Sequence, residues 1–85
     1  MHWEVECTDE FVEWYQALSY SERESIGFVV KLLEETGVQL GYPYSSKIVE
    51  AKNNLRELRV QHQGCPYRIL YAFDPRKVAI LIIRG

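Results

Sequence analysis

Apolar and polar positions change their spacing several times along this chain, and each spacing predicts a different element. Apolar and polar residues alternate over 2–7, as they do in a half-covered β-strand. Apolar residues three and four positions apart then predict amphipathic helices over 9–18 and 21–36. A capping box of Ser21 and Glu24 opens the second helix, so we expect the two helices to form a hairpin.

The second half of the chain has a different pattern. Residues 37–54 show no sustained period and predict a long loop, with a short helical turn near 48–52. Residues 55–62, 67–73 and 78–84 are rich in β-forming residues and predict three strands joined by turns. The order β-α-α-β-β-β describes a small α+β domain, in which the helical hairpin covers one face of a curled, largely antiparallel sheet.

The last predicted strand does not alternate. Residues 78–83 are apolar without interruption, which is typical of a central strand that is covered on both faces. Two helices can cover only one face of a sheet. We therefore expect a continuation of the chain beyond Gly85, or a partner protein, to cover the other face.

Length and composition allow a single globular domain over residues 1–85. The chain has 85 residues, of which 47% are hydrophobic and 26% charged, so it is neither disordered nor large enough for two cores. Its longest apolar run is far shorter than the roughly 20 residues that span a bilayer, and its N-terminus lacks a signal-peptide pattern. Because no export signal is present, we expect a cytoplasmic protein. Because the sequence has no metal-binding motif and no glycine-rich phosphate loop, we expect no metal or cofactor.

The charges are distributed unevenly along the chain. Residues 1–44 carry two basic and nine acidic side chains, whereas residues 45–85 carry eight basic and three acidic ones. Such asymmetry within one small domain indicates a surface that faces an anion, and RNA is an obvious candidate. An ordinary solvated β-surface would explain it equally well, so both interpretations stay open at this point.

The candidates for nucleophilic catalysis are weak. Neither Cys7 nor Cys65 lies in a recognisable catalytic pattern, and a thiolate needs a base held near it. His62 precedes Cys65 by three residues at a predicted turn, which is no evidence of pairing by itself. We therefore do not expect a cysteine enzyme.

Two arginines occupy the middle of neighbouring predicted strands. Arg59 lies in the first of them and Arg68 in the second. An arginine framed by apolar residues, as Arg68 is by Tyr67 and Ile69, is costly to place unless an anion uses it. A cross-strand ion pair with Glu57 would also explain the arrangement and would not exclude a function.

Two segments carry a resemblance to a known family. Leu55–Arg59 and Tyr67–Tyr71, followed by an apolar closing strand, are similar to the phage-derived HigB-like (Gp49-like) branch of the RelE/ParE toxin superfamily. The stretch 40–47 also resembles the segment before that strand in this branch. The helical hairpin agrees with the family in order and length, so the resemblance covers essentially the whole chain.

The resemblance implies a toxin of a type II toxin–antitoxin system. Members of this branch resemble metal-independent endoribonucleases that cut messenger RNA, typically on the ribosome, and they bind a helix-turn-helix, HigA-like antitoxin. Matched position by position, Arg68 is the expected phosphate-stabilising arginine, Arg59 is the second, and Lys47 is expected to hold the RNA backbone. Arginine suits the first two roles, because its planar fork donates two hydrogen bonds to phosphate oxygens.

The remaining expectations concern the other basic residues and the proton-transfer group. We expect a positive surface on the open side of the sheet, formed by Lys47, Arg59 and Arg68 together with Arg56 and Arg84, and we expect Lys52 as a further RNA contact. His62 is the available candidate for proton transfer, since the family's acidic and aromatic residues after the last strand would lie beyond Gly85. The family's usual C-terminal helix would also be missing, so we expect this 85-residue form to be impaired as a nuclease.

Two other functions stay open from the sequence. One is a ParE-like toxin that inhibits DNA gyrase by protein–protein contact and needs no catalytic residues. The other is a non-catalytic protein that only binds the antitoxin. RNA cleavage, induction of a DNA-damage response and absence of growth arrest, respectively, would distinguish the three.

Overall fold

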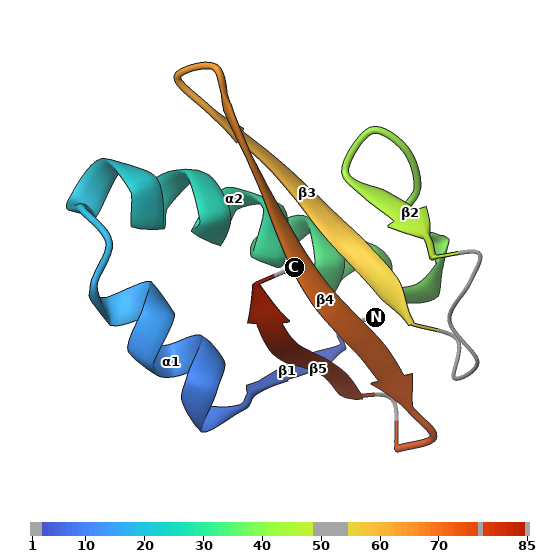
Figure 1. Ribbon diagram of the computed structural model, residues 1–85. Helices are drawn as coiled ribbons and strands as arrows, with labels where there is room; N and C mark the ends of the chain where they lie inside the picture. The colour runs from blue at the N-terminus through green and yellow to red at the C-terminus, as the bar shows by residue number, and fades with distance from the viewer. Residues whose placement is uncertain (1–2, 49–54, 77, 85) are drawn as a thin grey trace.

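Two helices pack on one face of a β-sheet in the computed structural model, which describes residues 3–48, 55–76 and 78–84 (Figure 1). The elements are β1 (Glu4–Cys7), α1 (Asp9–Gln16), α2 (Tyr20–Thr36), the 3₁₀ helix η1 (Gly37–Gln39), β2 (Ser45–Lys47), β3 (Arg56–His62), β4 (Cys65–Asp74) and β5 (Val78–Arg84).

The described strands form one mixed sheet in the order β1-β5-β4-β3-β2. β1 runs parallel to β5 at one edge, and the other neighbours are antiparallel. The predicted α+β class and the helical hairpin on a largely antiparallel sheet are thereby confirmed, and the sheet has one strand more than predicted, β2. Because the parallel pair needs a crossover, the helical hairpin connects β1 to the rest of the sheet and covers one of its faces.

The predicted loop over 37–54 is wrong in two places. Residues 37–39 form the short helix η1, and residues 45–47 form β2, which pairs with β3 at the edge of the sheet. Three residues of sequence Ser-Ser-Lys are too short and too polar to show an alternation, so only the pairing with β3 defines this strand. Most of the predicted helical turn near 48–52 lies outside the described residues.

The start of the second helix also differs from the prediction. Ser19, not Ser21, is the N-cap: its Oγ accepts from the Glu22 amide at 3.2 Å, and Glu22 Oε1 accepts from the Ser19 amide at 2.9 Å. Both serines have a glutamate three residues later, so the sequence motif alone fits two starting points. The first cap is as expected, because Thr8 Oγ1 accepts from the amide of Phe11.

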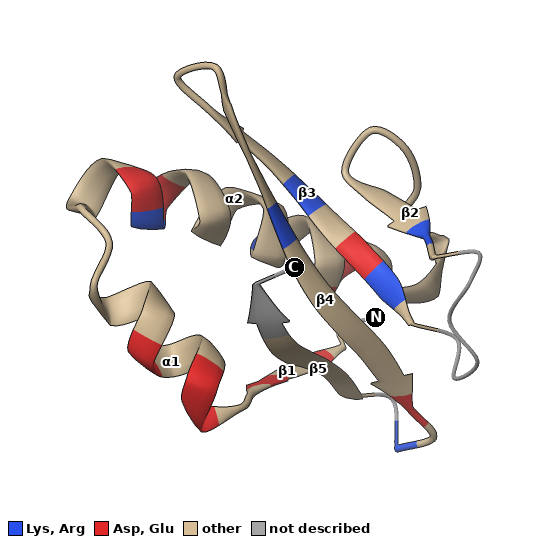
Figure 2. Cartoon of the chain, viewed as in Figure 1, with Lys and Arg blue, Asp and Glu red and all other residues tan. Residues whose placement is uncertain are grey.

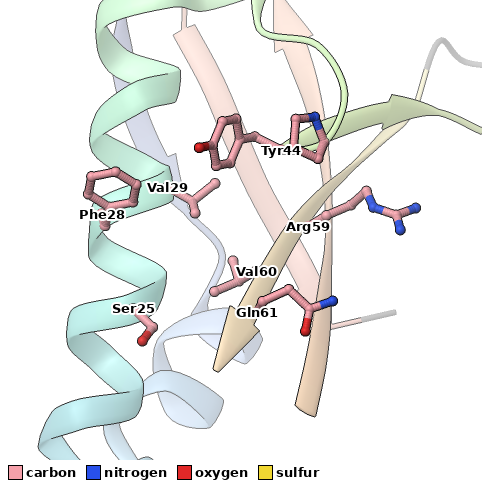
Figure 3. Close-up of a pocket in the computed structure, with 8 residues that line it drawn as sticks. Ser25, Phe28, Val29, Tyr44, Arg59, Val60 and Gln61 are labelled. Carbon is pink, nitrogen blue, oxygen red and sulfur yellow. The ribbon is translucent and has the colours of Figure 1, made fainter. Parts of the chain in front are cut away.

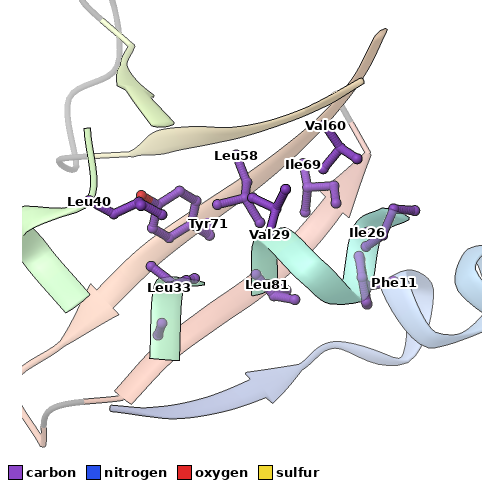
Figure 4. Close-up of a cluster of buried hydrophobic side chains, with 11 residues drawn as sticks. Phe11, Ile26, Val29, Leu33, Leu40, Leu58, Val60, Ile69, Tyr71 and Leu81 are labelled. Atoms are coloured by element: carbon purple, nitrogen blue, oxygen red, sulfur yellow. The ribbon is translucent and has the colours of Figure 1, made fainter. Parts of the chain in front are cut away.

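The core lies between α2 and the helix-facing side of the sheet (Figure 4). Alternate strand positions point into it, and its fully buried side chains include Ile26, Leu33, Leu58, Ile69 and Leu81. Full burial of a side chain of this size stabilises the folded state by about 1.5–3 kcal/mol. The register of the sheet is therefore fixed, because a shift of one residue would expose this set to solvent.

The opposite face of the sheet has no second layer within the described part of the chain. Ala79 and Leu81 of β5 are buried under the helices, whereas Ile80 points to the other side and is only half-buried. Leu70 and Ala72 of β4 are half-buried on that same side. We call this side the open face. The expectation that another segment or protein covers it stays a prediction.

Candidate nucleic-acid interface

Arg59 and Arg68 form a cross-strand pair on the open face, and basic positions lie side by side in β3 and β4 (Figure 2). The Arg59 amide donates to the carbonyl of Tyr44 at 2.7 Å, so the main chain of Arg59 faces β2 and not β4. Arg59 and Arg68 are thus a non-hydrogen-bonded pair, the kind in which opposite side chains approach most closely. The structure brings these two predicted residues together.

Arg59 is held from two sides. Its Nη1 lies 3.5 Å from Glu57 Oε1, and its guanidinium carbon lies 5.4 Å from the ring centroid of Tyr42. Glu57 also accepts from Ser46 Oγ at 3.1 Å, which orients the carboxylate. Arg68 is exposed, and no hydrogen bond or ion pair engages it among the residues described. One arginine of the pair is therefore oriented and the other is available to a ligand.

His62 does not join these arginines. It lies three positions after Arg59, so its side chain leaves β3 on the opposite, helix-facing side. There His62 Nδ1 shares a hydrogen bond of 2.8 Å with Ser25 Oγ of α2. The grouping of His62 with Arg59 and Arg68 in one catalytic site is therefore not supported by the geometry, because alternation along β3 separates them.

Glu22 of α2 lies in the same region as His62. Its carboxylate accepts from the hydroxyl of Tyr67 on β4 as well as from Ser19. These hydrogen bonds, the one from Tyr67 first, lower the pKa of Glu22 to about 2. Two hydrogen bonds, Tyr67 to Glu22 and Ser25 to His62, join the first turns of α2 to the β3–β4 hairpin. These four side chains therefore stabilise the packing of α2 on the sheet.

The expectation that Lys47 and Arg56 join Arg59 and Arg68 on the open face is wrong, whereas their contact with RNA stays a prediction. These two residues pair with one another across β2 and β3, and Arg56 pairs with the buried Tyr71, so both leave the sheet on the helix-facing side. Arg56 Nε donates to Ser45 Oγ at 3.2 Å and to the Tyr71 hydroxyl at 3.3 Å, and Nη2 donates to the Leu40 carbonyl at 3.4 Å. Arg56 thus closes one end of the core. Lys52 and the side chain of Arg84 lie outside the described residues.

A hollow of about 310 Å³ lies beside the arginine pair, between α2 and the edge of β3 (Figure 3). Val29 and Val60 form its buried apolar floor, and Phe28 and Tyr44 stand at its sides. Arg59 and Gln61 line it from β3 and point away from α2 (Figure 3). The other lining residues are Ser25 and Pro43. The sequence did not predict this hollow, because its walls come from three separate segments.

Neither cysteine carries a sign of nucleophilic chemistry. Cys7 and Cys65 are free thiols far apart in the fold, and partial burial raises the pKa of the Cys7 thiol, which disfavours the thiolate. Within residues 3–48, 55–76 and 78–84, no three His, Cys, Asp or Glu side chains gather in a group that could hold a metal ion. None of the described helices is long and apolar enough to cross a membrane.

Sequence comparison connects this chain to a family and to named relatives. The family described as phage-derived protein Gp49-like matches residues 13–85. The chain is 38% identical over 73 residues to HigB3, a candidate toxin of Mycobacterium tuberculosis, and 35% identical over 74 residues to HigB2 of the same organism. The matches cover 85% of this chain in both cases, but only 62% of HigB3 and 37% of HigB2.

Structural comparison places the fold among those of RelE proteins. A chain of the Escherichia coli RelBE toxin–antitoxin complex is 13% identical with a TM-score of 0.71, and the match covers 98% of this chain and 94% of that one. The archaeal RelE–RelB complex of Pyrococcus horikoshii contains a chain that is 19% identical, also with a TM-score of 0.71, over 100% of this chain and 94% of that one. At such low identity these matches concern the fold alone.

Proposed function

Because this chain belongs to the phage-derived protein Gp49-like family, a HigB-like branch of the RelE superfamily, we propose that it is the toxin of a type II toxin–antitoxin pair and that it cleaves messenger RNA. The proposed reaction needs no metal. The 2′-hydroxyl of a ribose attacks the adjacent phosphorus, and the bond from phosphorus to the 5′-oxygen of the next nucleotide breaks. The products are a 2′,3′-cyclic phosphate and a free 5′-hydroxyl.

The arginine pair on the open face is the observation that carries this proposal. Attack on the phosphate concentrates negative charge on its non-bridging oxygens in the transition state. Arg59 and Arg68 stand opposite one another, so their guanidinium groups can bind the same phosphate from two sides. Arg59 is held in place by Glu57 and Tyr42, whereas Arg68 is the exposed cation that binds the incoming phosphate.

Glu57 is the proton acceptor in this proposal. It is on the same face as both arginines, next to Arg59, and its carboxylate is oriented by Ser46. It takes the proton of the attacking 2′-hydroxyl, and water supplies the proton that the departing 5′-oxygen needs. His62 has no part in this step, because it is on the other side of β3. The signal that could have identified Glu57 is the strand alternation, which places Glu57, Arg59 and Gln61 on one side.

A helix-turn-helix, HigA-like antitoxin is the proposed protein partner, and the ribosome is the proposed place of cleavage. The similar folds in the E. coli and P. horikoshii complexes are bound to an antitoxin, RelB. In this chain the open face carries the half-buried Leu70, Ala72 and Ile80 beside the arginines. A partner that covered these residues would remove apolar surface from water and block the arginine pair in the same step.

Inducible expression in bacteria, with growth and messenger RNA followed together, tests the proposal. The sequence alone predicts an impaired nuclease, but with Glu57 as the base we expect the wild-type chain to arrest growth and cut messenger RNA in a translating extract. Arg68→Ala should do neither. Arg76→Ala is the matched control, since Arg76 is also an exposed arginine, lies in the turn after β4 and forms ion pairs with Asp74 and Glu6. Growth arrest with a DNA-damage response and intact RNA would reject the nuclease and favour a toxin that binds gyrase.

A further inference from the structure

The hollow between α2 and β3 has aromatic sides and an apolar floor, so its shape and chemistry suit a flat, partly apolar group. Phe28 is 60% exposed and Tyr44 is 38% exposed, and both rings border the buried side chains of Val29 and Val60. Large rings that are exposed around an apolar floor indicate a binding site more often than a solvated surface. The rings stand on opposite supports, one on a helix and one on a loop (Figure 3).

The loop that carries Tyr44 is fixed to the sheet. The amides of Tyr44 and Ser45 both donate to the carbonyl of Gly41, at 3.0 and 3.1 Å, and the carbonyl of Tyr44 accepts from Arg59. Tyr44 is therefore positioned by hydrogen bonds of its own main chain, which a change of its side chain leaves in place. The wall of the hollow is preorganised, so a ligand would not need to order it first.

The edge of β3 adds polar groups to the hollow. Main-chain groups of alternate residues face the same edge, so those of Gln61 point to the same side as those of Arg59. β2 begins only at Ser45, which pairs with Leu58, and it does not extend along β3 as far as Gln61. The amide and carbonyl of Gln61 thus offer one donor and one acceptor beside the aromatic rings, as the edge of a nucleobase requires.

The lining of the hollow carries no negative charge that would repel a nucleic acid. None of its eight residues is acidic, and Arg59, one of them, points away from α2 to the open face, where it belongs to the arginine pair. We propose that this hollow holds one nucleobase of single-stranded RNA, next to the phosphate that Arg59 and Arg68 bind. This inference rests on the proposed function and adds to it a site that binds a base by stacking. Such binding depends little on which base is bound.

Binding to two probes separates base contacts from phosphate contacts. The first probe is a labelled single-stranded RNA with 2′-O-methyl groups, which cannot be cleaved, and the second is polyphosphate of similar charge. Tyr44→Ala and Phe28→Ala should each weaken RNA binding roughly five- to tenfold, which is the lower part of the range for losing one base-stacking contact. Both variants should leave polyphosphate binding unchanged. Arg68→Ala should weaken the binding of both probes. Tyr20→Ala is the control, because Tyr20 is an exposed aromatic of α2 that does not line the hollow.

The outcomes keep this inference distinct from the proposed function. If both aromatic variants bind RNA as tightly as the wild type, the base site is rejected while the nuclease proposal stands. An equal loss for RNA and polyphosphate would also reject it, since the rings would then act only on the arginines. Unchanged RNA binding together with lost association with a co-expressed antitoxin would identify the hollow as a protein-docking site instead. A wild-type chain that binds neither probe would reject the proposed function itself.

Discussion

Arg59 and Arg68 are directly opposite each other on β3 and β4, in the type of pair whose side chains approach most closely. Like charges at such positions destabilise a sheet, by a fraction of a kcal/mol to about 1 kcal/mol. Glu57 compensates only one of the two arginines within the described structure. A pair that lowers the stability of the unbound protein is expected at a binding site, where an anionic ligand supplies the negative charge that balances the second arginine.

The first prediction concerns this conflict between stability and binding. Arg68→Gln should leave the free energy of unfolding unchanged or raise it by up to about 0.5 kcal/mol, because it removes the repulsion and creates no cavity. The same change should weaken RNA binding and reduce its salt dependence. Urea unfolding and fluorescence anisotropy measure the two effects.

Arg76→Gln is the comparison for that experiment. Arg76 lies 2.8 Å from Asp74 and 3.7 Å from Glu6, so its removal loses favourable surface contacts and should slightly lower stability. It should not affect RNA binding. A clear loss of stability in Arg68→Gln would show that Arg68 stabilises the sheet, and the argument from charge repulsion would fail.

The second prediction separates Arg56 from the RNA-binding arginines. Arg56→Ala should lower the free energy of unfolding by about 1–3 kcal/mol, because Ser45, Tyr71 and the Leu40 carbonyl would lose their common donor at the end of the core. Arg59→Ala should cost much less, since its contacts are at the surface. Equal, small losses in urea unfolding for both variants would contradict the structural role of Arg56.

Arg56 also illustrates where prediction from sequence ends. The strand itself was predictable, because its β-forming residues and its neighbours define it locally. Whether Arg56 turns outward or inward depends on Leu40, Ser45 and Tyr71, which lie 11 to 16 positions away along the chain. No local pattern encodes such a contact, and a basic residue near a strand end is more often exposed.

In the candidate site, too, the local sequence predicts some features, and contacts between distant segments decide the others. Alternation along β3 puts Glu57 and Arg59 on one side, and the pairing of Arg59 with Arg68 follows from two adjacent strands of a hairpin. His62 is separated from them by the same alternation. The hollow beside the pair could not be predicted, because it depends on how α2 and the loop before β2 meet β3.

The third prediction concerns acid stability. The folded-state pKa of Glu22 is about 2, below its ordinary value of 4.5, so its contribution to stability is complete above about pH 4.5 and is lost as the pH falls toward 2. Asp74 also has a lowered pKa and contributes in the same direction, through its hydrogen bonds with Arg76. Glu22→Gln should therefore reduce the loss of stability between pH 5 and pH 2 without abolishing it.

Tyr67→Phe checks the cause of that effect. The Tyr67 hydroxyl is the strongest influence on the pKa of Glu22, so its removal should flatten the same part of the stability curve. His62→Gln is the comparison, because the charge of His62 lowers the pKa of Glu22 less than the hydrogen bonds do. Thermal unfolding across this pH range measures all three variants. If the stability of Glu22→Gln fell with pH as steeply as that of the wild type, the prediction would be wrong.

The fourth prediction tests the proton acceptor. Glu57→Gln keeps the size of the side chain and its contact with Ser46, but it removes the base. RNA cleavage in a translating extract should fall by about 10²- to 10⁴-fold, the usual contribution of general base catalysis. RNA binding should stay the same or become tighter, because a negative charge is lost beside Arg59. A nuclease that binds its substrate and cannot cut it is the expected phenotype.

His62→Ala completes this test, because His62 is the proton-transfer group that the sequence suggested. Its side chain is on the helix-facing side of β3, bonded to Ser25, so its removal should loosen the contact between α2 and the hairpin and leave the cleavage rate per folded molecule unchanged. Loss of cleavage in His62→Ala with normal stability, together with full activity of Glu57→Gln, would reverse the assignment and require the hairpin to rearrange on RNA.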